Sequence, residues 1–436
     1  MKKILMFILI TCIFLSSCTK DQIVGNLTNL QHQQNLTADV GVAIDWYKLQ
    51  LRFLRERNST LNSSDIGYIG IGLYESIRNG IPNAQSFSSK LNQMPAMPAS
   101  DKNNLYIWQV SANAAMAALL RSYNTGLTTA NKASIDSLEK LNNQKFTLLA
   151  GLPTFTRSQL YGRAVAAAVR KWSLTDGYNG SNAGYVPPVF AGSWVPTPPA
   201  FANGIFPYVS NARPLIAANA TIKAPFPLFS YSEFTISDYY KMMKIVYQKS
   251  KNLTTDEKNI ALFWNDQGNE VSYTPAGHHI AIIILALQKV KADLWLAAET
   301  FAKAGIAERE AFIVCFRAKY TYNTLRPITY IRKFIDPNWL SFIPTPPHPE
   351  YPAAHALITG SVMQAATKVL GENLAFTDNT FLYRGFAARN YSSLINAAEE
   401  AGNSRLYGGI HCQPSIDAGL ALGIQVGNTA GNIKLR

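Results

Sequence analysis

The chain has 436 residues, of which 47% are hydrophobic and 15% are charged. This composition supports a sizeable buried core and excludes a disordered chain. The formal net charge of +13 favours anionic partners in general, but no run of basic residues interleaved with aromatics indicates a nucleic-acid surface.

The N-terminal residues have the pattern of an export signal. Two lysines precede an apolar run over residues 4–15 that is too short to span a bilayer. The motif LSSC at residues 15–18 resembles a bacterial lipoprotein processing site, and an ordinary secretory signal is the alternative. We expect residues 1–17 to be a signal peptide and Cys18 to carry lipid. The mature protein would then be exported and held on a bacterial membrane by this anchor alone, facing the periplasm or the cell surface.

A polar stretch over residues 18–39 fits a tether, and after it apolar residues recur at helical spacing. Strand-like alternation is scarce, so we predict an all-α helical bundle in a single domain over residues 40–436. The oligomeric state stays open, a homo-oligomer included. The segments with helical spacing are Val40–Arg55, Asn103–Tyr123, Ala130–Leu149, Arg157–Trp172, Thr235–Tyr247, Asp256–Asp266, His278–Lys303, Ile306–Leu325, Ala353–Leu370 and Pro414–Ala430.

One long segment, Asp176–Phe234, interrupts the helical pattern and is rich in proline, glycine and aromatic residues. A connection of this length in a compact domain is usually functional. We expect it either to cover a site or to pack against the bundle.

The stretch KYTYNTLRP places two cations near a predicted helix end. Lys319 and Arg326 are seven residues apart, so on one helix they would project from the same face, and Pro327 makes continuation past Arg326 unfavourable. Such a pair lies on a solvated surface in most proteins; the alternative is an anion pocket.

The stretch HPEYPAAH leads into a predicted helix with Pro352 in its first turn. The backbone N–H groups of Ala353, Ala354 and His355 would then lie at the helix N-terminus, where oxyanions bind. A lone histidine at such a position is more often a cap or a satisfied core residue than a catalyst.

The stretch NSRLYGGIHCQ adds a third group of candidate residues. Gly408 and Gly409 let the backbone leave the helix, so Arg405 and His411 can point into a common space. Together the three stretches offer three cations, helix N–H groups and two imidazoles. This set suits a tetrahedral or trigonal-bipyramidal oxyanion, with one histidine as ligand and the other as acid/base.

The order K-x6-R-P, P-x-x-H and S-R-x5-H resembles the vanadium-dependent haloperoxidases and the type 2 phosphatidic acid phosphatase superfamily to which they belong. Upstream, FWNDQGNEVSYTPAGHHIAIIILAL, AAVRKWSLTDGYNG and SWVPTPPAF resemble segments of the bacterial haloperoxidase branch. The resemblance covers most of the chain from about Leu160 onward, although membership of a superfamily does not fix the function.

The resemblance implies vanadate as cofactor, with Lys319, Arg326 and Arg405 neutralising its oxygens and His411 binding vanadium. His355 would act as acid/base, and Lys319 would polarise hydrogen peroxide for attack by a halide. The product would be a hypohalous species, with an organic acceptor as a further partner. In the phosphatase alternative, His411 is the nucleophile and His355 protonates the leaving oxygen.

Two departures from the family pattern bear on activity. The usual Pro-Ser-Gly-His is Pro-Ala-Ala-His here, so Ala353 lacks a hydroxyl, which removes a hydrogen bond to a charged group worth about 1.5–3 kcal/mol. A third hypothesis is therefore a degenerate, oxyanion-binding surface lipoprotein. The superfamily often has an acid four residues after the ligand histidine, where this chain has Ser415; Asp417 lies nearby, and Asp266 is a candidate partner for a histidine.

His348 lies seven residues before His355, where bromide- and iodide-oxidising relatives tend to carry histidine. The resemblance thus favours bromide or iodide, and a surface histidine in a proline loop is the alternative. We interpret His278 and His279 as structural. Cys315 and Cys412 either form a disulfide or remain two buried thiols.

Overall fold

The computed structural model describes residues 39–56, 62–147, 151–266 and 272–436. The predicted signal peptide, Cys18 and nearly all of the tether lie outside these residues. The described part is mainly helical, which confirms the predicted all-α fold. Its α-helices are α2 (Gly41–Arg55), α3 (Ser63–Ile77), α4 (Trp108–Tyr123), α5 (Thr129–Thr147), α6 (Leu152–Ser173), α7 (Asp238–Lys251), α8 (Thr255–Phe263), α9 (Pro275–Lys289), α10 (Leu294–Tyr322), α11 (Pro327–Phe334), α12 (Ala354–Leu370), α13 (Leu394–Tyr407) and α14 (Gln413–Gly431).

Strand structure in the described ranges is a single small antiparallel pair. β1 (Phe376–Asp378) pairs with β2 (Arg389–Tyr391), with Phe376 opposite Tyr391. None of the described helices combines the length and apolar composition needed to cross a membrane.

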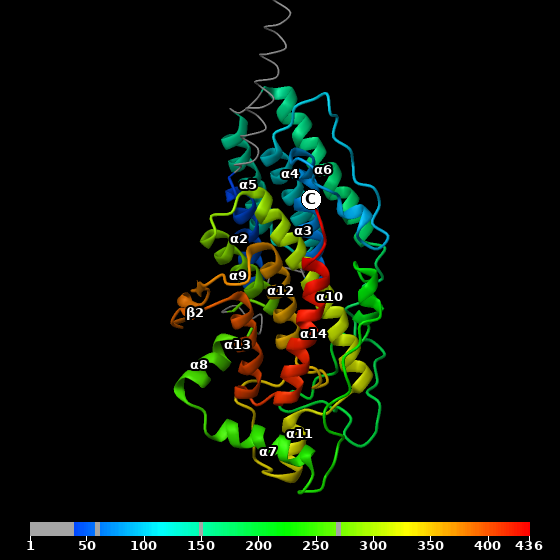
Figure 1. The fold of residues 1–436 in the computed structure, drawn as a ribbon, viewed down its shortest axis with the longest axis vertical. Helices are drawn as coiled ribbons and strands as arrows, with labels where there is room; N and C mark the ends of the chain where they lie inside the picture. Colours follow the sequence, from blue (N-terminus) through cyan, green and yellow to red (C-terminus); the bar gives the residue numbers. More distant parts are fainter. Residues whose placement is uncertain (1–38, 57–61, 148–150, 267–271) are drawn as a thin grey trace, which may run out of the picture.

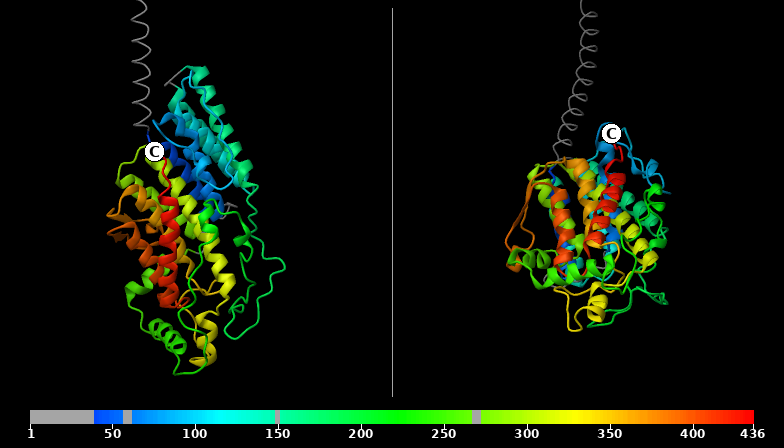
Figure 2. Two further views of the ribbon diagram at one scale, coloured as in Figure 1. Left: turned by 45° about the vertical axis from the view of Figure 1, so that its right-hand side comes forward. Right: turned by 60° about the horizontal axis from the view of Figure 1, so that its bottom comes forward.

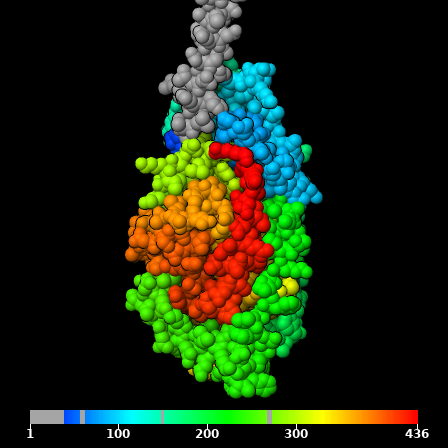
Figure 3. Space-filling view, viewed as in Figure 1, coloured from blue at the N-terminus to red at the C-terminus, as the bar shows by residue number. Residues whose placement is uncertain are grey.

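The long helix α10 is the centre of the arrangement. It packs against α3 on one side and α12 on another, and α14 packs along α12. Figure 1 shows α2 to α6 gathered at one end of an elongated molecule and α7, α8 and α11 at the other. Figure 2 shows the same division after rotation, and Figure 3 shows α14, in red, running along the surface.

Residues near Gly305 make the contact between α10 and α3 unusually close. A Cβ atom at Gly305 would lie 2.8 Å from the carbonyl oxygen of Ile66, so only glycine allows this approach. The helix break predicted at this point, between Lys303 and Ile306, was wrong, because α10 continues through it. The chain instead breaks between α9 and α10, where Lys291 has φ of 52°.

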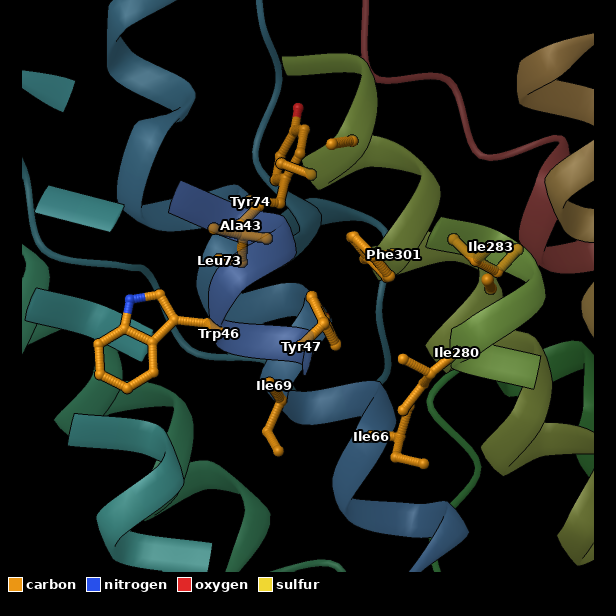
Figure 4. Close-up of a cluster of buried hydrophobic side chains, with 14 of the residues drawn as sticks. Ala43, Trp46, Tyr47, Ile66, Ile69, Leu73, Tyr74, Ile280, Ile283 and Phe301 are labelled. Atoms are coloured by element: carbon orange, nitrogen blue, oxygen red, sulfur yellow. The ribbon is translucent and has the colours of Figure 1, made fainter. Parts of the chain in front are cut away.

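The core on the N-terminal side of α10 combines aromatic and aliphatic side chains (Figure 4). Tyr47 of α2 stacks on Phe301 of α10, with ring centroids 3.6 Å apart. Trp46 is fully buried, and its indole N–H donates to Asn113 Oδ1 over 2.8 Å. The first of these contacts joins α2 to α10, and the second joins α2 to α4.

The irregular segment Asp176–Phe234 runs beside the C-terminal half of α10 (Figure 1). Tyr185 Oη donates to Asn323 Oδ1 over 3.0 Å, and Ile205 N donates to the carbonyl oxygen of Pro347 over 3.0 Å. Ile205 and Phe206 contribute to the wall of an internal cavity. Both expectations therefore hold, because Val209 and Ala212 of the segment also pack against Ile313 of α10.

Cys315 and Cys412 are both buried free thiols. The disulfide alternative is therefore wrong for this structure.

Candidate active site

Four helix ends bring the predicted site residues together. Lys319 lies in the last turn of α10, which ends at Tyr322, and Asn323 follows in the left-handed conformation with φ of 48°. Arg326 is the residue immediately before α11. The prediction that Lys319 and Arg326 share one helix face was wrong, because the chain turns between them. Both side chains nevertheless reach the same buried region, as the contacts below show.

The ammonium group of Lys319 is fully buried and donates to two backbone carbonyls. The distances are 2.8 Å to Pro349 O and 2.9 Å to Glu350 O. Burial lowers the pKa of Lys319 to about 7; the positive charge of Arg326 adds to this effect, whereas the Glu350 carboxylate opposes it. Lys319 is thus a cation with too little negative charge around it.

The guanidinium of Arg326 is also fully buried and links three parts of the site. It donates to the carbonyls of His348 (2.8 Å) and Ile410 (3.0 Å). It also lies 3.1 Å from His411 Nε2 and 3.0 Å from His348 Nδ1. Burial lowers the pKa of Arg326 to about 10. Because a guanidinium has only donors, both imidazole nitrogens accept from it.

Arg405 is held in the last turn of α13. Its Nε donates to Ser404 Oγ over 2.9 Å and one Nη donates to the carbonyl oxygen of Trp264 over 2.6 Å. Burial lowers its pKa to about 10 against the attraction of Asp266. Gly409, with φ of 74°, turns the chain after α13, as predicted, and directs His411 into the space that Arg405 faces.

The carboxylate partner of His411 is Glu350, which the sequence analysis missed. Glu350 Oε1 lies 2.8 Å from His411 Nδ1 and accepts the Cys412 backbone N–H over 3.3 Å. Glu350 therefore fixes the proton on Nδ1 and leaves the lone pair on Nε2. Asp417, proposed for this role, is exposed on α14 and accepts from Gln413, so that assignment was wrong.

His355 lies in the first turn of α12, with its Nε2 buried and without a hydrogen-bond partner among the described residues. The nearest carboxylate is Asp266, whose Oδ2 is 3.9 Å from Nε2. Burial lowers the pKa of His355 well below 6.5, and the positive charge of Arg405 adds to the shift. His355 is thus a neutral imidazole with a free nitrogen.

The start of α12 differs in detail from the prediction. The helix begins at Ala354, Ala353 is its N-cap without a side-chain capping bond, and Pro352 precedes the cap instead of lying in the first turn. The Ala353 N–H donates to the carbonyl oxygen of Ser415 over 3.1 Å, so it is not available to a ligand. Ala354 lines the cavity, and its first-turn N–H and that of His355 have no acceptor within the helix.

Asp266 joins His355 to a buried ionic chain, as the prediction of a histidine partner anticipated. Its Oδ2 lies 3.3 Å from His278 Nδ1, and His278 Nε2 lies 2.8 Å from Asp378 Oδ2. Burial lowers the pKa of His278, but the two carboxylates together outweigh it and raise the pKa to about 10. His278 is therefore an imidazolium, which supports its structural interpretation.

His348 is 7% exposed and lines the cavity, so the alternative of a surface histidine was wrong. Its ring packs against Phe316, with centroids 5.4 Å apart. Burial lowers its pKa well below 6.5, and Lys319 and Arg326 strengthen the effect. His348 Nδ1 lies 3.0 Å from an Arg326 nitrogen, which can only donate, and 3.2 Å from the Pro349 carbonyl oxygen. The shorter contact makes Nδ1 an acceptor and places the ring proton on Nε2, which is then a neutral hydrogen-bond donor.

These side chains enclose one end of a cavity of about 400 Å³. His348, Ala354, His355, Arg405 and His411 line it. Among the described residues, the carboxylates that raise the pKa values of these buried cations are Glu350, which acts on Lys319 and Arg326, and Asp266, which acts on Arg405. Buried charges without counter-charge are costly, so the site is suited to an added anion.

The comparisons with known proteins agree with this chemistry. A bacterial vanadium-dependent iodoperoxidase of known structure is 30% identical to this chain, covers 89% of it and 94% of its own length, and has a TM-score of 0.77. The chain belongs to the vanadium-dependent haloperoxidases. The model of the "VCPO second helical-bundle domain" matches residues 299–435 of the chain.

Two further structures show the same fold at lower identity. The holo-type bacterial vanadium-dependent chloroperoxidase is 16% identical, with 86% and 93% of the two chains covered and a TM-score of 0.63. The apo-type structure is 17% identical, with 86% and 94% covered and a TM-score of 0.63. No curated protein matched the sequence.

The residues of this haloperoxidase fit vanadate by three observations. Lys319, Arg326 and Arg405 lack full counter-charge, the N–H groups at the start of α12 are free within the helix, and His411 has its lone pair on Nε2. In the structure this lone pair accepts one Arg326 N–H, and a ligand at Nε2 would replace that bond.

Proposed function

We propose that this protein is a vanadate-dependent haloperoxidase that oxidises bromide or iodide with hydrogen peroxide to a hypohalous species. The observation that carries the proposal is the set of buried cations around His411, whose pKa values are lowered by burial, an effect that the Glu350 and Asp266 carboxylates only partly offset. The 30% identity to an iodoperoxidase supports the same conclusion.

Vanadate, when bound, supplies a Lewis-acidic centre that activates peroxide toward a halide. Lys319, Arg326 and Arg405 would hold its oxygens, and His411 Nε2 would bind vanadium. Glu350 keeps the proton on His411 Nδ1, which preserves the lone pair on the other nitrogen.

His355 would accept and return protons of the peroxide. His355 lines the cavity, its neutral imidazole has a buried Nε2 without a partner among the described residues, and Asp266 at 3.9 Å would stabilise the imidazolium that forms. His348 offers an N–H donor that would meet a large halide beside Phe316. The preference for bromide or iodide over chloride rests on this residue.

The experiment is an assay of the form beginning after Cys18, with and without orthovanadate. We expect peroxide-dependent oxidation of iodide and bromide that requires vanadate and is lost in His411→Ala. A parallel phosphate-ester assay tests the phosphatase alternative. Ester hydrolysis without halide oxidation would contradict the proposal. Inactivity in both assays would favour the hypothesis of a degenerate, oxyanion-binding surface lipoprotein.

We further propose that the protein is exported and anchored to a bacterial membrane through lipid on Cys18. The motif at residues 15–18 supports this. Metabolic labelling with a tagged fatty acid should mark the full chain and not Cys18→Ala; equal labelling of both would contradict the proposal.

A further inference from the structure

The far end of the cavity carries a carboxylate that the proposed function does not use. Glu308 of α10 is 2% exposed and lines the cavity, and no hydrogen-bond donor among the described residues meets its Oε1. Its other oxygen lies 2.6 Å from His279 Nδ1. His279 Nε2 in turn lies 2.9 Å from Thr359 Oγ1. An open oxygen on a buried carboxylate is an unfilled acceptor.

A neighbouring glutamate shows what a purely structural role looks like. Glu310 lies two residues further along α10 and is 1% exposed. Its Oε1 accepts the Leu215 N–H over 2.7 Å, and its Oε2 accepts from Asn219 Nδ2 over 2.8 Å. Both oxygens of Glu310 are therefore satisfied by the protein. Glu308 lines the cavity and keeps one oxygen without a partner among the described residues.

The cavity between Glu308 and the vanadate end has an apolar wall. Glu308, Phe312, Phe316 and Lys319 follow one another at spacings of four, four and three, so they lie along one face of α10. Eleven residues of helix separate Glu308 from Lys319, which is about 16 Å along the axis. Phe312 and Phe316 lie between a negative end and a positive end.

Phe206 completes an aromatic cluster on this wall. Its ring lies edge-on to Phe312 and to Phe316, with both centroid distances 5.3 Å. Its φ of 60° is unusual for a bulky residue, and such conformations concentrate at ligand sites. Most of the exposed surface of the cavity is apolar, and its polar groups include Glu308 and the histidines of the site, a combination typical of sites for small organic molecules.

The acidic end is also close to the proposed acid/base. Thr359, which contacts His279, is four residues after His355 on α12, about 6 Å along the helix axis. A small molecule with its head group at Glu308 would therefore place its body beside the reacting centre.

We propose that this cavity binds an organic acceptor with an aromatic body and a protonated amine, the amine donating to Glu308 and the ring lying against Phe312 and Phe316. The proposal rests on the proposed function, because it makes the bound molecule the acceptor of the oxidised halogen. The halide loses two electrons and peroxide gains them. A carbon–halogen bond replaces a ring carbon–hydrogen bond, and the ring proton and one solvent proton leave in two water molecules.

The test compares three phenols of matched shape: tyramine, 4-ethylphenol and 3-(4-hydroxyphenyl)propanoate. Calorimetric titration without vanadate measures their binding to the protein independently of activity. We expect tyramine to bind roughly tenfold more tightly than 4-ethylphenol or better, and the propanoate to bind weakest, because a charge-assisted bond to Glu308 favours only the amine.

Variants locate the effect. Glu308→Gln should abolish the preference for tyramine, whereas Glu372→Gln, whose side chain is 77% exposed, should keep it. Equal binding of tyramine and 4-ethylphenol to the unaltered protein would overturn the proposal, and so would a preference that survives in Glu308→Gln. The three-phenol comparison decides the point even if that variant does not fold.

The two proposals can fail separately. If the unaltered protein with orthovanadate oxidises no halide, the proposed function fails, while amine-selective binding without vanadate is measured regardless. If the function holds, kcat/KM for iodination should favour tyramine over 4-ethylphenol in the unaltered protein, and this ratio should fall about tenfold in Glu308→Gln.

Discussion

Two buried cations on α10 have opposite surroundings. Arg309 and Lys319 are ten residues apart, and both are fully buried. Arg309 donates to Ser64 and to Asp176 over 2.8 Å each and lies 3.4 Å from Glu310; burial lowers its pKa, but nearby negative groups outweigh this and raise it. Lys319 contacts backbone carbonyls, and its pKa falls to about 7. Burial alone does not reveal a binding site, whereas missing counter-charge does.

The largest expected effect concerns the paired cation. Arg309→Met should lower the free energy of unfolding by about 3–5 kcal/mol, because it leaves the Asp176 and Glu310 carboxylates buried without their partner. Urea unfolding at pH 7 measures this. A loss of unfolding free energy below about 1 kcal/mol would show that the surroundings of Arg309 and Lys319 do not differ as described.

The unpaired cation should behave differently. Lys319→Met should change the free energy of unfolding by less than about 1 kcal/mol without ligand, because a poorly compensated charge disappears with its hydrogen bonds. Orthovanadate should bind about 10- to 150-fold more weakly, the equivalent of one charge-assisted hydrogen bond of about 1.5–3 kcal/mol. Calorimetric titration measures the affinity, and unchanged binding would remove Lys319 from the site.

His278 extends the comparison to a paired imidazolium beside the reacting end. Its folded pKa of about 10 exceeds the ordinary 6.5, so its stabilisation is complete below pH 6.5 and is lost as pH rises through 10. The difference in unfolding free energy between the unaltered protein and His278→Asn should shrink by at most about 1.4 kcal/mol per pH unit between these limits. Urea unfolding at pH 6, 7.5 and 9 tests this; a constant difference would argue against an imidazolium.

The smallest expected effect is at the N-cap of α12. Ala353→Ser should raise the free energy of unfolding by about 1 kcal/mol without ligand, because serine caps a helix and alanine does not. Adding Ala354→Gly, which removes a methyl group from the cavity lining, should then strengthen orthovanadate binding by about tenfold. Ala388→Ser, at an exposed position, is the control. Unchanged binding in the double variant would mean that the two alanines do not weaken the site.

The motifs predicted the cations and histidines of the site but not all of their surroundings. The order of the motifs along the chain was enough to predict Lys319, Arg405 and His411 as site residues, because each of them lies within one of the motifs. Glu350 was missed because it is 61 residues from His411, and only the folded path of the proline-rich stretch brings them together. The sequence signal that could have indicated Glu350 was a single carboxylate within a stretch of prolines and apolar residues.

The helices show a similar limit. α3 was not predicted because nearly all of its residues are buried, so its sequence has no polar face to reveal a helical period. The false break at Gly305 has the same origin, since glycine there serves a helix contact instead of a turn. Sequence periodicity identifies helices with one solvent-exposed polar face, and it does not identify helices that are buried on all sides.

The length of α10 sets a fixed distance between two parts of the cavity. One uninterrupted helix of 29 residues carries both Glu308 and Lys319, and its packing on α3 at Gly305 holds it in place. The distance between the acidic end and the oxyanion end therefore cannot adjust to the guest. Selection among amines becomes a matter of reach: one with too short a spacer leaves its ring away from the reacting centre, and one with too long a spacer cannot seat its head group.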